Sequence, residues 1–237
     1  METLNNSILK RLEEGNKSGH CNLSSLKLEE LPDSIDRYPN IITLNLKNNK
    51  LSQLPVGIKA LSGLHTIELS RNKFASFPQE LSTMHSLVQI YAWTNKIDII
   101  PDEIANLSNL MRLELERNRI TNIPPALGQL QNLRYLDLSQ NLITALPSEI
   151  GNLHTLEVLN LSDNSLEYLP KTLEQLDQLK KLELSGNHIG DPKELEFIFQ
   201  LSLNTLDILF SSSFFILCVS NSECFIIARS FVYNSLI

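Results

Sequence analysis

Residues 133–150 read L-R-Y-L-D-L-S-Q-N-L-I-T-A-L-P-S-E-I, and this stretch decides the fold. The same arrangement of leucines, an asparagine and a proline returns along most of the 237-residue chain. Seven of its ten prolines recur at every twenty-third position, at Pro32, Pro55, Pro78, Pro101, Pro124, Pro147 and Pro170. A fixed period of this length indicates stacked repeats rather than one conventional core, because each unit is too small to bury its own apolar face.

The repeat divides into two parts with different hydrophobic periods. Ahead of Asn141, Leu136 and Leu138 alternate with polar residues, which predicts a short strand with its leucines facing inward. After Pro147, Ile150 and Leu153 are three residues apart, which suits a short helical turn. We expect the strands of successive units to pair in parallel, so that eight of them form a sheet about 34 Å long. The asparagine amide can donate and accept, so we expect it to satisfy backbone groups between the units.

The pattern L-x-x-L-x-L-x-x-N, as in Leu156, Leu159, Leu161 and Asn164, resembles the leucine-rich repeat. The resemblance covers residues 18–200. It implies an α/β fold, a leucine-rich repeat solenoid: a curved arc with a parallel inner sheet and short helical turns on the convex face. About eight repeats of this period fill the range.

Both ends of the repeat array carry candidate caps. Residues 1–17 predict an N-terminal capping helix that ends at Gly15, with an apolar stripe at Leu4, Ile8, Leu9 and Leu12. Residues 191–194 read D-P-K-E, which predicts the start of a closing helix. The inner face of that helix would consist of Leu195, Ile198 and Phe199.

Residues 201–237 form a hydrophobic, Ser- and Phe-rich tail outside the repeat pattern, with three charged residues and five of the nine Phe. Three interpretations stay open: an irregular hydrophobic cap on the last repeat, a membrane-associating segment, or an unnatural end such as a truncated gene model. The longest uncharged run, residues 208–222, contains five serines. A spanning helix needs about 20 mostly apolar residues, so this run is too short and too polar for the membrane interpretation.

Composition and motifs exclude several functional classes. The net charge of −7 argues against nucleic acid as a partner. Cys21, Cys218 and Cys224 form no C-x-x-C pair, and the five histidines fall in different repeats without ligand spacing, so we expect no metal and no cofactor. Phosphate-binding and nucleophile motifs are missing, which predicts a protein that is not an enzyme. The polar N-terminus has no signal-peptide core, which predicts a cytoplasmic protein.

The outward strand positions are the candidate binding surface, which would lie on the concave face of the arc. They are small and polar in the outer repeats, but aromatic and charged residues gather in the middle three. Trp, Tyr and Arg are enriched at binding hot spots. We therefore predict a partner-binding cluster of exposed residues at Tyr91, Trp93, Arg112, Glu114, Glu116, Arg117, Tyr135 and Asp137.

A structural interpretation of the same residues stays open. Ala92 stands where the repeat has a leucine, so Trp93 or Tyr91 could fill the space that Ala92 leaves. Glu and Arg on neighbouring strands could pair with each other, which is worth about 0–1 kcal/mol when exposed. The binding interpretation predicts that Trp93→Ala weakens a partner and leaves the melting curve nearly unchanged.

The longer motif x-L-P-x-x-I-x-x-L-x-x-L-x-x-L-x-L-x-x-N, as in residues 146–150 and 100–104, resembles the intracellular Ras-group (Shoc-2/Sur-8-like) class of leucine-rich repeats. That resemblance implies a monomeric, non-enzymatic scaffold with a protein partner, a small GTPase or a phosphatase. The alternative is a recognition or regulatory fragment of a larger leucine-rich-repeat protein of the kinase or immune-receptor type. An enzyme within the 37-residue tail has no catalytic cluster to support it.

Overall fold

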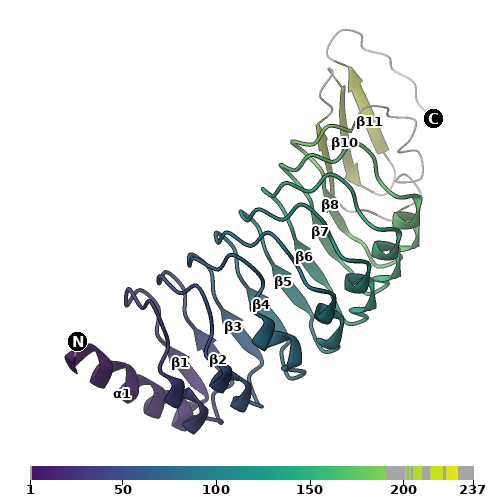
Figure 1. Cartoon of the computed structure of the whole chain (residues 1–237). Coiled ribbons are helices and arrows are strands. Elements are labelled where there is room, and N and C mark those ends of the chain that lie inside the picture. Colours follow the sequence, from purple (N-terminus) through teal and green to yellow (C-terminus); the bar gives the residue numbers. More distant parts are fainter. Residues whose placement is uncertain are drawn as a thin grey trace.

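A computed structural model describes residues 2–189, 201, 203, 205–209, 214–220 and 223–228. The chain forms an open, elongated stack of repeats that starts with helix α1, Glu2–Ser18 (Figure 1). Eight parallel strands of three residues follow, each pairing with the next: β1 His20–Asn22, β2 Thr43–Asn45, β3 Thr66–Glu68, β4 Gln89–Tyr91, β5 Arg112–Glu114, β6 Tyr135–Asp137, β7 Val158–Asn160 and β8 Lys181–Glu183. The predicted fold, a solenoid of leucine-rich repeats, is confirmed.

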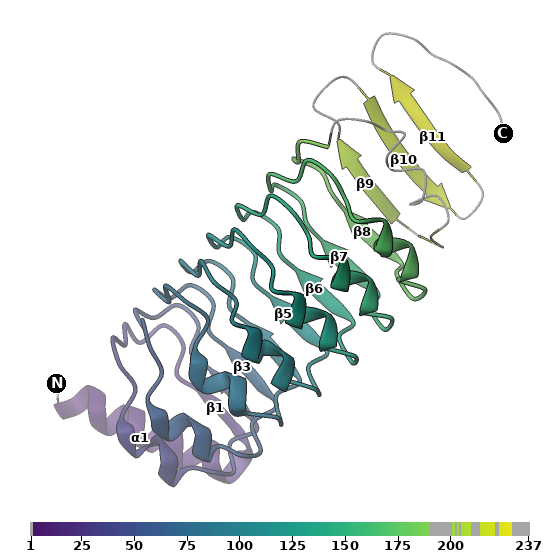
Figure 2. The same cartoon turned by 45° about the vertical axis from the view of Figure 1, so that its right-hand side comes forward.

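A short 3₁₀ helix follows each of the seven prolines in register. These helices are η1 Asp33–Arg37, η2 Val56–Ala60, η3 Gln79–Thr83, η4 Asp102–Asn106, η5 Pro125–Gln129, η6 Ser148–Asn152 and η7 Lys171–Gln175. The proline preceding each helix has a φ between −61° and −76°, which its ring fixes in advance. The helices lie along one side of the stack and the strands along the other (Figure 2). The short helical turn predicted after each proline is therefore confirmed.

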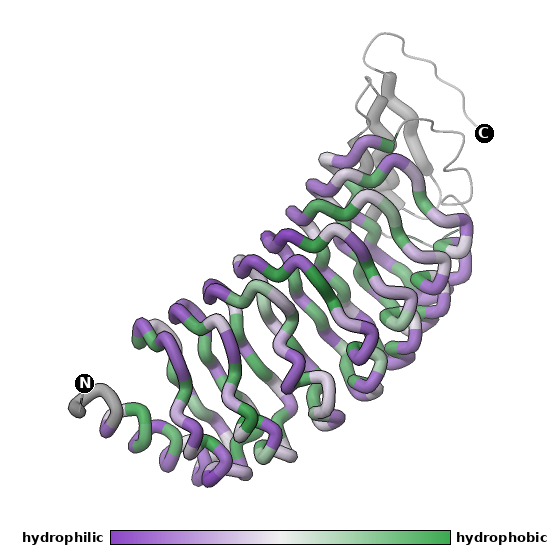
Figure 3. The backbone as a smooth tube through the Cα atoms, viewed as in Figure 1, coloured by the Kyte–Doolittle hydropathy of each residue, from purple (hydrophilic) through white to green (hydrophobic). Residues whose placement is uncertain are grey.

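The core is a set of apolar rows that run through the stack from one repeat to the next. The middle residue of each of the eight strands is buried, whereas nearly all the residues beside it are at least partly exposed. Apolar and polar stretches alternate along the chain in every repeat (Figure 3). Each repeat therefore buries its leucines against its neighbours rather than within itself.

A ladder of seven asparagines joins the repeats: Asn49, Asn72, Asn95, Asn118, Asn141, Asn164 and Asn187. Each amide nitrogen donates to at least one carbonyl in its own repeat and to one in the preceding repeat. For Asn118, these include Leu115 O at 2.9 Å and Ala92 O at 3.0 Å. The amide oxygen of Asn118 accepts from the backbone N–H of Ile97 at 3.0 Å. The predicted role of the asparagine is confirmed.

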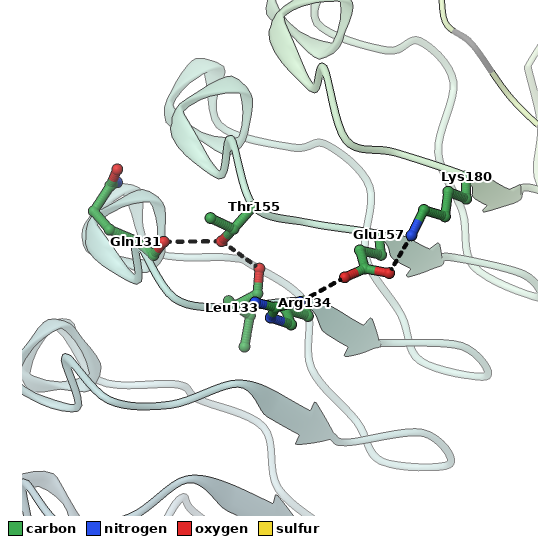
Figure 4. Close-up of polar contacts among 6 residues, drawn as sticks. All are labelled: Gln131, Leu133, Arg134, Thr155, Glu157 and Lys180. Atoms are coloured by element: carbon green, nitrogen blue, oxygen red, sulfur yellow. Dashed lines mark hydrogen bonds and ion pairs between the residues drawn. The ribbon is translucent and has the colours of Figure 1, made fainter.

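Charged side chains also join repeats at the surface. Glu157 lies between Arg134 and Lys180, which come from the preceding and the following repeat (Figure 4). The two ion pairs measure 3.0 Å and 2.6 Å, and the Lys180 ammonium lowers the pKa of the Glu157 carboxyl. Thr155 donates to the carbonyl oxygens of Gln131 and Leu133 in the same region. In this row, charges of alternating sign pair across the repeats.

Helix α1 packs against β1, and Ile8 and Leu12 are buried there. The predicted helix end at Gly15 is wrong, because the helix continues to Ser18 and Gly19 follows it with φ +81°. Glycine accepts this left-handed conformation without strain. Gly15 instead allows close packing, since a Cβ there would lie 2.6 Å from the Cβ of Cys21. Burial raises the pKa of the Cys21 thiol to about 11.

Beyond the repeats, the sheet continues as β9 Thr205–Leu209, β10 Phe214–Ser220 and β11 Glu223–Ala228. Strand β9 pairs in parallel with β8, whereas β10 is antiparallel to both β9 and β11. The repeat pattern predicts no strands in this tail. The predicted closing helix at residues 191–199 lies outside the described residues. Within the described part of the chain, no helix has the length and apolar character needed to cross a bilayer.

Candidate functional site

The eight predicted site residues lie on one face of the sheet, over β4, β5 and β6 and the turns that follow them. The strand register places Tyr91 beside Glu114 and Glu114 beside Asp137. It also places Arg112 beside Tyr135. Trp93 and Glu116 lie two residues after the ends of β4 and β5, and Arg117 lies three residues after the end of β5. We call this set of eight residues the central cluster: Tyr91, Trp93, Arg112, Glu114, Glu116, Arg117, Tyr135 and Asp137.

Arg112 is held in place by three members of the central cluster. Its Nε lies 2.6 Å from Oε1 of Glu114 on the same strand. Its guanidinium carbon lies 3.7 Å from the ring centroid of Tyr135 and 5.8 Å from that of Tyr91. The guanidinium therefore lies against the aromatic face of Tyr135, a favourable cation–π arrangement. Burial raises the pKa of the Tyr135 hydroxyl to about 12, so this side chain is neutral near pH 7.

Trp93 interacts with two cations from preceding repeats. The ring centroid lies 4.3 Å from Nζ of Lys47 and 4.9 Å from the guanidinium carbon of Arg71. Ser70 occupies the equivalent position in the repeat between Lys47 and Trp93, and it is completely buried.

The prediction of exposed aromatics at Tyr91, Trp93 and Tyr135 is wrong, because all three are partly buried. Neighbouring repeats cover their rings, which the residue types within a single repeat do not reveal.

Lys47 and Arg71 are site residues that the sequence analysis does not assign. Both stand at outward positions of their repeats, two repeats and one repeat before Trp93. The sequence does contain a signal for these two residues, because the chain has a single Trp and cations stand at outward positions of the two preceding repeats. Applied across repeats, the preference of cations for aromatic faces would have identified them.

Three carboxylates lie on the other side of Trp93. Oε2 of Glu116 is buried and has no hydrogen-bond partner among the described residues. Burial, with Asp137 and Glu114 nearby, raises the pKa of the Glu116 carboxyl to about 7. Asp137 is only 8% exposed, which contradicts the predicted exposure of this residue. It accepts from Oγ of Ser139 at 2.6 Å and from Nδ2 of Asn160 at 3.1 Å, so neighbouring polar groups enclose it.

A row of left-handed backbone positions borders the face, one per repeat. Its members have φ between 53° and 70°: Ser25, Asn48, Arg71, Thr94, Arg117, Gln140, Asp163 and Gly186. Arg117 of the central cluster belongs to this row and donates from Nε to Oε1 of Gln140 at 2.8 Å. The hydroxyl of Thr94 is buried and lacks a partner among the described residues. The row fixes the direction in which these side chains leave the sheet.

The central cluster coincides with neither a metal-binding group nor a hollow among the described residues. Across the described residues, no three His, Cys, Asp or Glu side chains are close enough to hold a metal ion. Two open hollows lie elsewhere, one between α1 and β1 and one over η4, η5 and η6, and neither includes a central cluster residue. The cluster combines aromatic rings and a guanidinium held by an ion pair with a buried carboxylate oxygen that has no partner within the described part of the chain.

Comparisons with known proteins agree with this fold. Residues 121–213 match a family model described as a leucine-rich repeat region, and residues 109–130 match a single leucine-rich repeat. Neither match points to a catalytic activity. No curated protein sequence matched the chain.

Three solved structures illustrate the likeness. A leucine-rich repeat protein of Leptospira interrogans is 32% identical with a TM-score of 0.63, covering 78% of this chain and 54% of its own. Internalin C2 of Listeria monocytogenes is 23% identical, with a TM-score of 0.74 and coverage of 85% and 92%, and shows the fold alone. The ectodomain of the Arabidopsis thaliana receptor kinase GASSHO1/SCHENGEN3, solved with Casparian strip integrity factor 2, is 26% identical, with a TM-score of 0.63 and coverage of 81% and 30%.

This chain therefore spans about half of the Leptospira protein and less than a third of the plant ectodomain. What it shares with all three is the stacked repeat itself. The regular proline period, the parallel strands with their asparagine ladder, and these matches identify the repeating units of this chain as leucine-rich repeats.

Proposed function

We propose that this protein is a non-enzymatic interaction module that binds a protein partner across the face of β4, β5 and β6. The observation that carries the proposal is the central cluster itself. Aromatic and charged side chains meet there on three adjacent repeats, whereas β1 and β2 present His20, Asn22, Thr43 and Asn45 on the same face.

The state of the cluster side chains supports binding. Arg112 is already oriented by Glu114 and Tyr135, so little side-chain entropy is lost when a partner contacts it. Trp, Tyr and Arg in a partly desolvated patch are the composition of binding hot spots.

The class of partner is a further part of the proposal. The resemblance to the Ras-group repeats favours a small GTPase or a phosphatase, a cytoplasmic location and a monomeric protein. The plant receptor ectodomain was solved with its ligand, which supports a proteinaceous partner for a stack of this kind. A GTPase panel is therefore the first set of partners to test.

A second candidate is a recognition part of a larger multidomain leucine-rich-repeat protein of the kinase or immune-receptor type. The likeness to the ectodomain of a membrane receptor kinase favours it. Sequencing full-length transcripts from the same locus tests this candidate. A transcript that joins this sequence to a kinase or nucleotide-binding domain would support it.

The experiment compares Trp93→Ala and Trp93→Ala/Arg112→Glu with the unmodified protein. Purified small GTPases, loaded with GDP or with a GTP analogue, and proteins captured from native lysate are the ligands. The matched control is Tyr168→Ala/Lys171→Glu, which changes an exposed aromatic and an exposed lysine outside the cluster. We expect the cluster variants to lose a partner that the control retains.

Melting curves decide between binding and structure. We expect Trp93→Ala to shift the melting temperature little, because the ring is only partly buried. Identical partners for the cluster variants and the unmodified protein would contradict the proposal. Unfolding of Trp93→Ala would assign the ring to the structure of the sheet.

A further inference from the structure

A row of cations runs along the stack at a position outside the central cluster. The residue after the ladder asparagine is basic in each of repeats two to five, and the equivalent position in repeat one is also basic. All five side chains are exposed. The position is uncharged in the next repeats, at Leu142 and Ser165. We call this set the basic row: Lys27, Lys50, Lys73, Lys96 and Arg119.

Backbone hydrogen bonds hold the basic row in line. The N–H of Lys50 donates to Leu28 O at 2.7 Å, and that of Lys73 donates to Leu51 O at 2.8 Å. The same bond recurs from Lys96 and from Arg119 to the preceding repeat. Consecutive members are therefore one strand spacing apart, about 4.8 Å, so that five cations occupy about 20 Å. Hydrophilic stretches recur once per repeat along one edge of the stack (Figure 3).

Most of this positive charge forms no ion pair among the described residues, and the acid that is paired with the row, Glu29, has its carboxyl pKa lowered by Lys50 and also by the charge of Lys73. Within the described residues, only Lys50 makes an ion pair, with Glu29 at 2.9 Å. The row of Arg134, Glu157 and Lys180 shows the opposite arrangement, in which an acid separates two cations. Like charges at equivalent positions of adjacent strands repel one another. A row of five cations is thus poorly compensated within the described part of the protein and open to an anionic partner.

The basic row lies close in the chain to the cations around Trp93. Lys47 precedes Lys50 by three residues, and Arg71 precedes Lys73 by two. The positive charge therefore extends from the turn onto the neighbouring face of the sheet. A partner that contacts one of these surfaces would have the other within reach.

The charge of the rest of the chain limits the size of the ligand. Residues 1–120 contain 14 cations and 14 acids, whereas residues 121–237 contain 6 cations and 13 acids. A long polyanion that extended past Arg119 would meet the acidic half of the protein. A segment of about 20 Å corresponds to about six residues of extended chain. The row therefore matches a short anionic peptide better than a nucleic acid or a lipid surface.

We propose that the basic row binds a short acidic segment, a run of Asp and Glu in extended conformation, on a partner protein. The carboxylates of the segment would pair with Lys73, Lys96 and Arg119, which make no ion pair within the described residues. This surface is distinct from the central cluster and does not depend on its function.

The test measures binding of fluorescein-labelled hexaglutamate to the full chain by fluorescence anisotropy at low salt. Lys73→Glu/Lys96→Glu is the row variant. Lys59→Glu/Lys171→Glu is the matched control, with the same charge change at exposed lysines of η2 and η7. We expect the row variant to weaken binding about tenfold, since two attractive contacts become repulsive, and the control to weaken it less than about twofold. Trp93→Ala should leave peptide binding unchanged, which separates this proposal from the function of the central cluster.

Two further comparisons vary the length of the glutamate peptide and the chemical class of the ligand. Affinity should rise from three to six glutamates and then level off, because about six residues fill the row. Equal weakening by the row variant and the control would overturn the proposal, as would the absence of hexaglutamate binding. A continued rise in affinity up to twelve glutamates, or tighter binding to a single-stranded oligonucleotide or to anionic vesicles, would also overturn it. Unchanged melting curves for both variants establish that the comparison concerns folded proteins.

Discussion

The asparagine ladder and the central cluster both place polar groups at fixed positions of the repeat. They differ in whether the buried polar atoms have hydrogen-bond partners. Asn118 makes hydrogen bonds with both its amide nitrogen and its amide oxygen. Glu116, two residues earlier, keeps a buried oxygen without a partner among the described residues. Satisfied buried groups hold a fold together, whereas unsatisfied ones cost stability. The difference therefore separates a side chain whose hydrogen bonds hold the stack together from one whose buried oxygen costs stability.

The largest effect is expected when the ladder is cut. Asn118→Ala removes four hydrogen bonds and leaves the Ile97 N–H without its partner, whereas the Ala92 and Leu115 carbonyls each keep one bond to a neighbouring ladder asparagine. We expect a loss of about 3 kcal/mol in the free energy of unfolding, measured by urea denaturation. Asn122→Ala is the control, because this exposed side chain bonds only to the Thr121 hydroxyl among the described residues. A loss below about 1 kcal/mol for Asn118→Ala would remove the distinction between the two regions.

The second effect concerns Glu116, whose pKa is raised to about 7 in the folded protein from 4.5. Between these values the folded state binds more protons than the unfolded state, so stability falls as pH rises from about 4.5 to about 7. Glu116→Gln should abolish that fall and raise stability at pH 8 by about 1 to 2 kcal/mol, less than the full shift implies because solvent still reaches the side chain. Urea denaturation at pH 5 and pH 8 measures it. Parallel pH profiles for the two proteins would show that Glu116 titrates normally.

A smaller gain is expected at Thr94. Its φ of 54° is unfavourable for a β-branched residue, and its buried hydroxyl has no partner among the described residues. Thr94→Gly should stabilise the protein by about 1 kcal/mol, since glycine accepts this conformation. The same change at Thr43, which lies in an extended strand, should destabilise it instead. We expect the urea midpoint to rise for Thr94→Gly and to fall for Thr43→Gly. A lower midpoint for both variants would contradict this prediction.

The smallest effect is expected at the surface row of alternating charge. Glu157→Lys places three cations together at Arg134, residue 157 and Lys180, and should lower the melting temperature slightly at low salt. The difference should vanish at about 1 M salt, where screening is strong. Adding Lys180→Glu should restore part of the loss. A shift that is independent of salt would point to packing rather than charge.

The repeat period and residue chemistry were sufficient to predict the eight strands of the repeats, the helical turns after proline and the role of the asparagine ladder, but not the strands β9, β10 and β11 of the tail. Each predicted feature depends on a residue type that returns at the same place, such as Pro147 or Asn141. The left-handed row could not be predicted in this way, because residues as different as Arg71, Thr94 and Gln140 occupy it. The backbone path is set there by the neighbouring repeats rather than by the side chain.

The candidate site was likewise predicted from the sequence only in part. Residue types were enough to select β4, β5 and β6 as the place where unusual side chains gather, and their role in binding stays a prediction. The cover over Trp93 comes from Lys47 and Arg71, which lie two repeats and one repeat earlier in the chain. The burial of Asp137 likewise depends on Ser139 and on Asn160 of the next repeat. Such contacts require the register between repeats, which no single repeat contains.

The asparagine ladder has a consequence for how such a protein can change in length. Each of the seven joints between successive repeats uses the same bonds between equivalent atoms 21 and 26 residues apart. Removing or duplicating one whole repeat would therefore leave two surfaces that already fit. The stack can therefore change in length only by whole repeats. Each added or deleted repeat would change the distance between the surfaces on its two sides by one strand spacing, and the residues of both surfaces would stay the same.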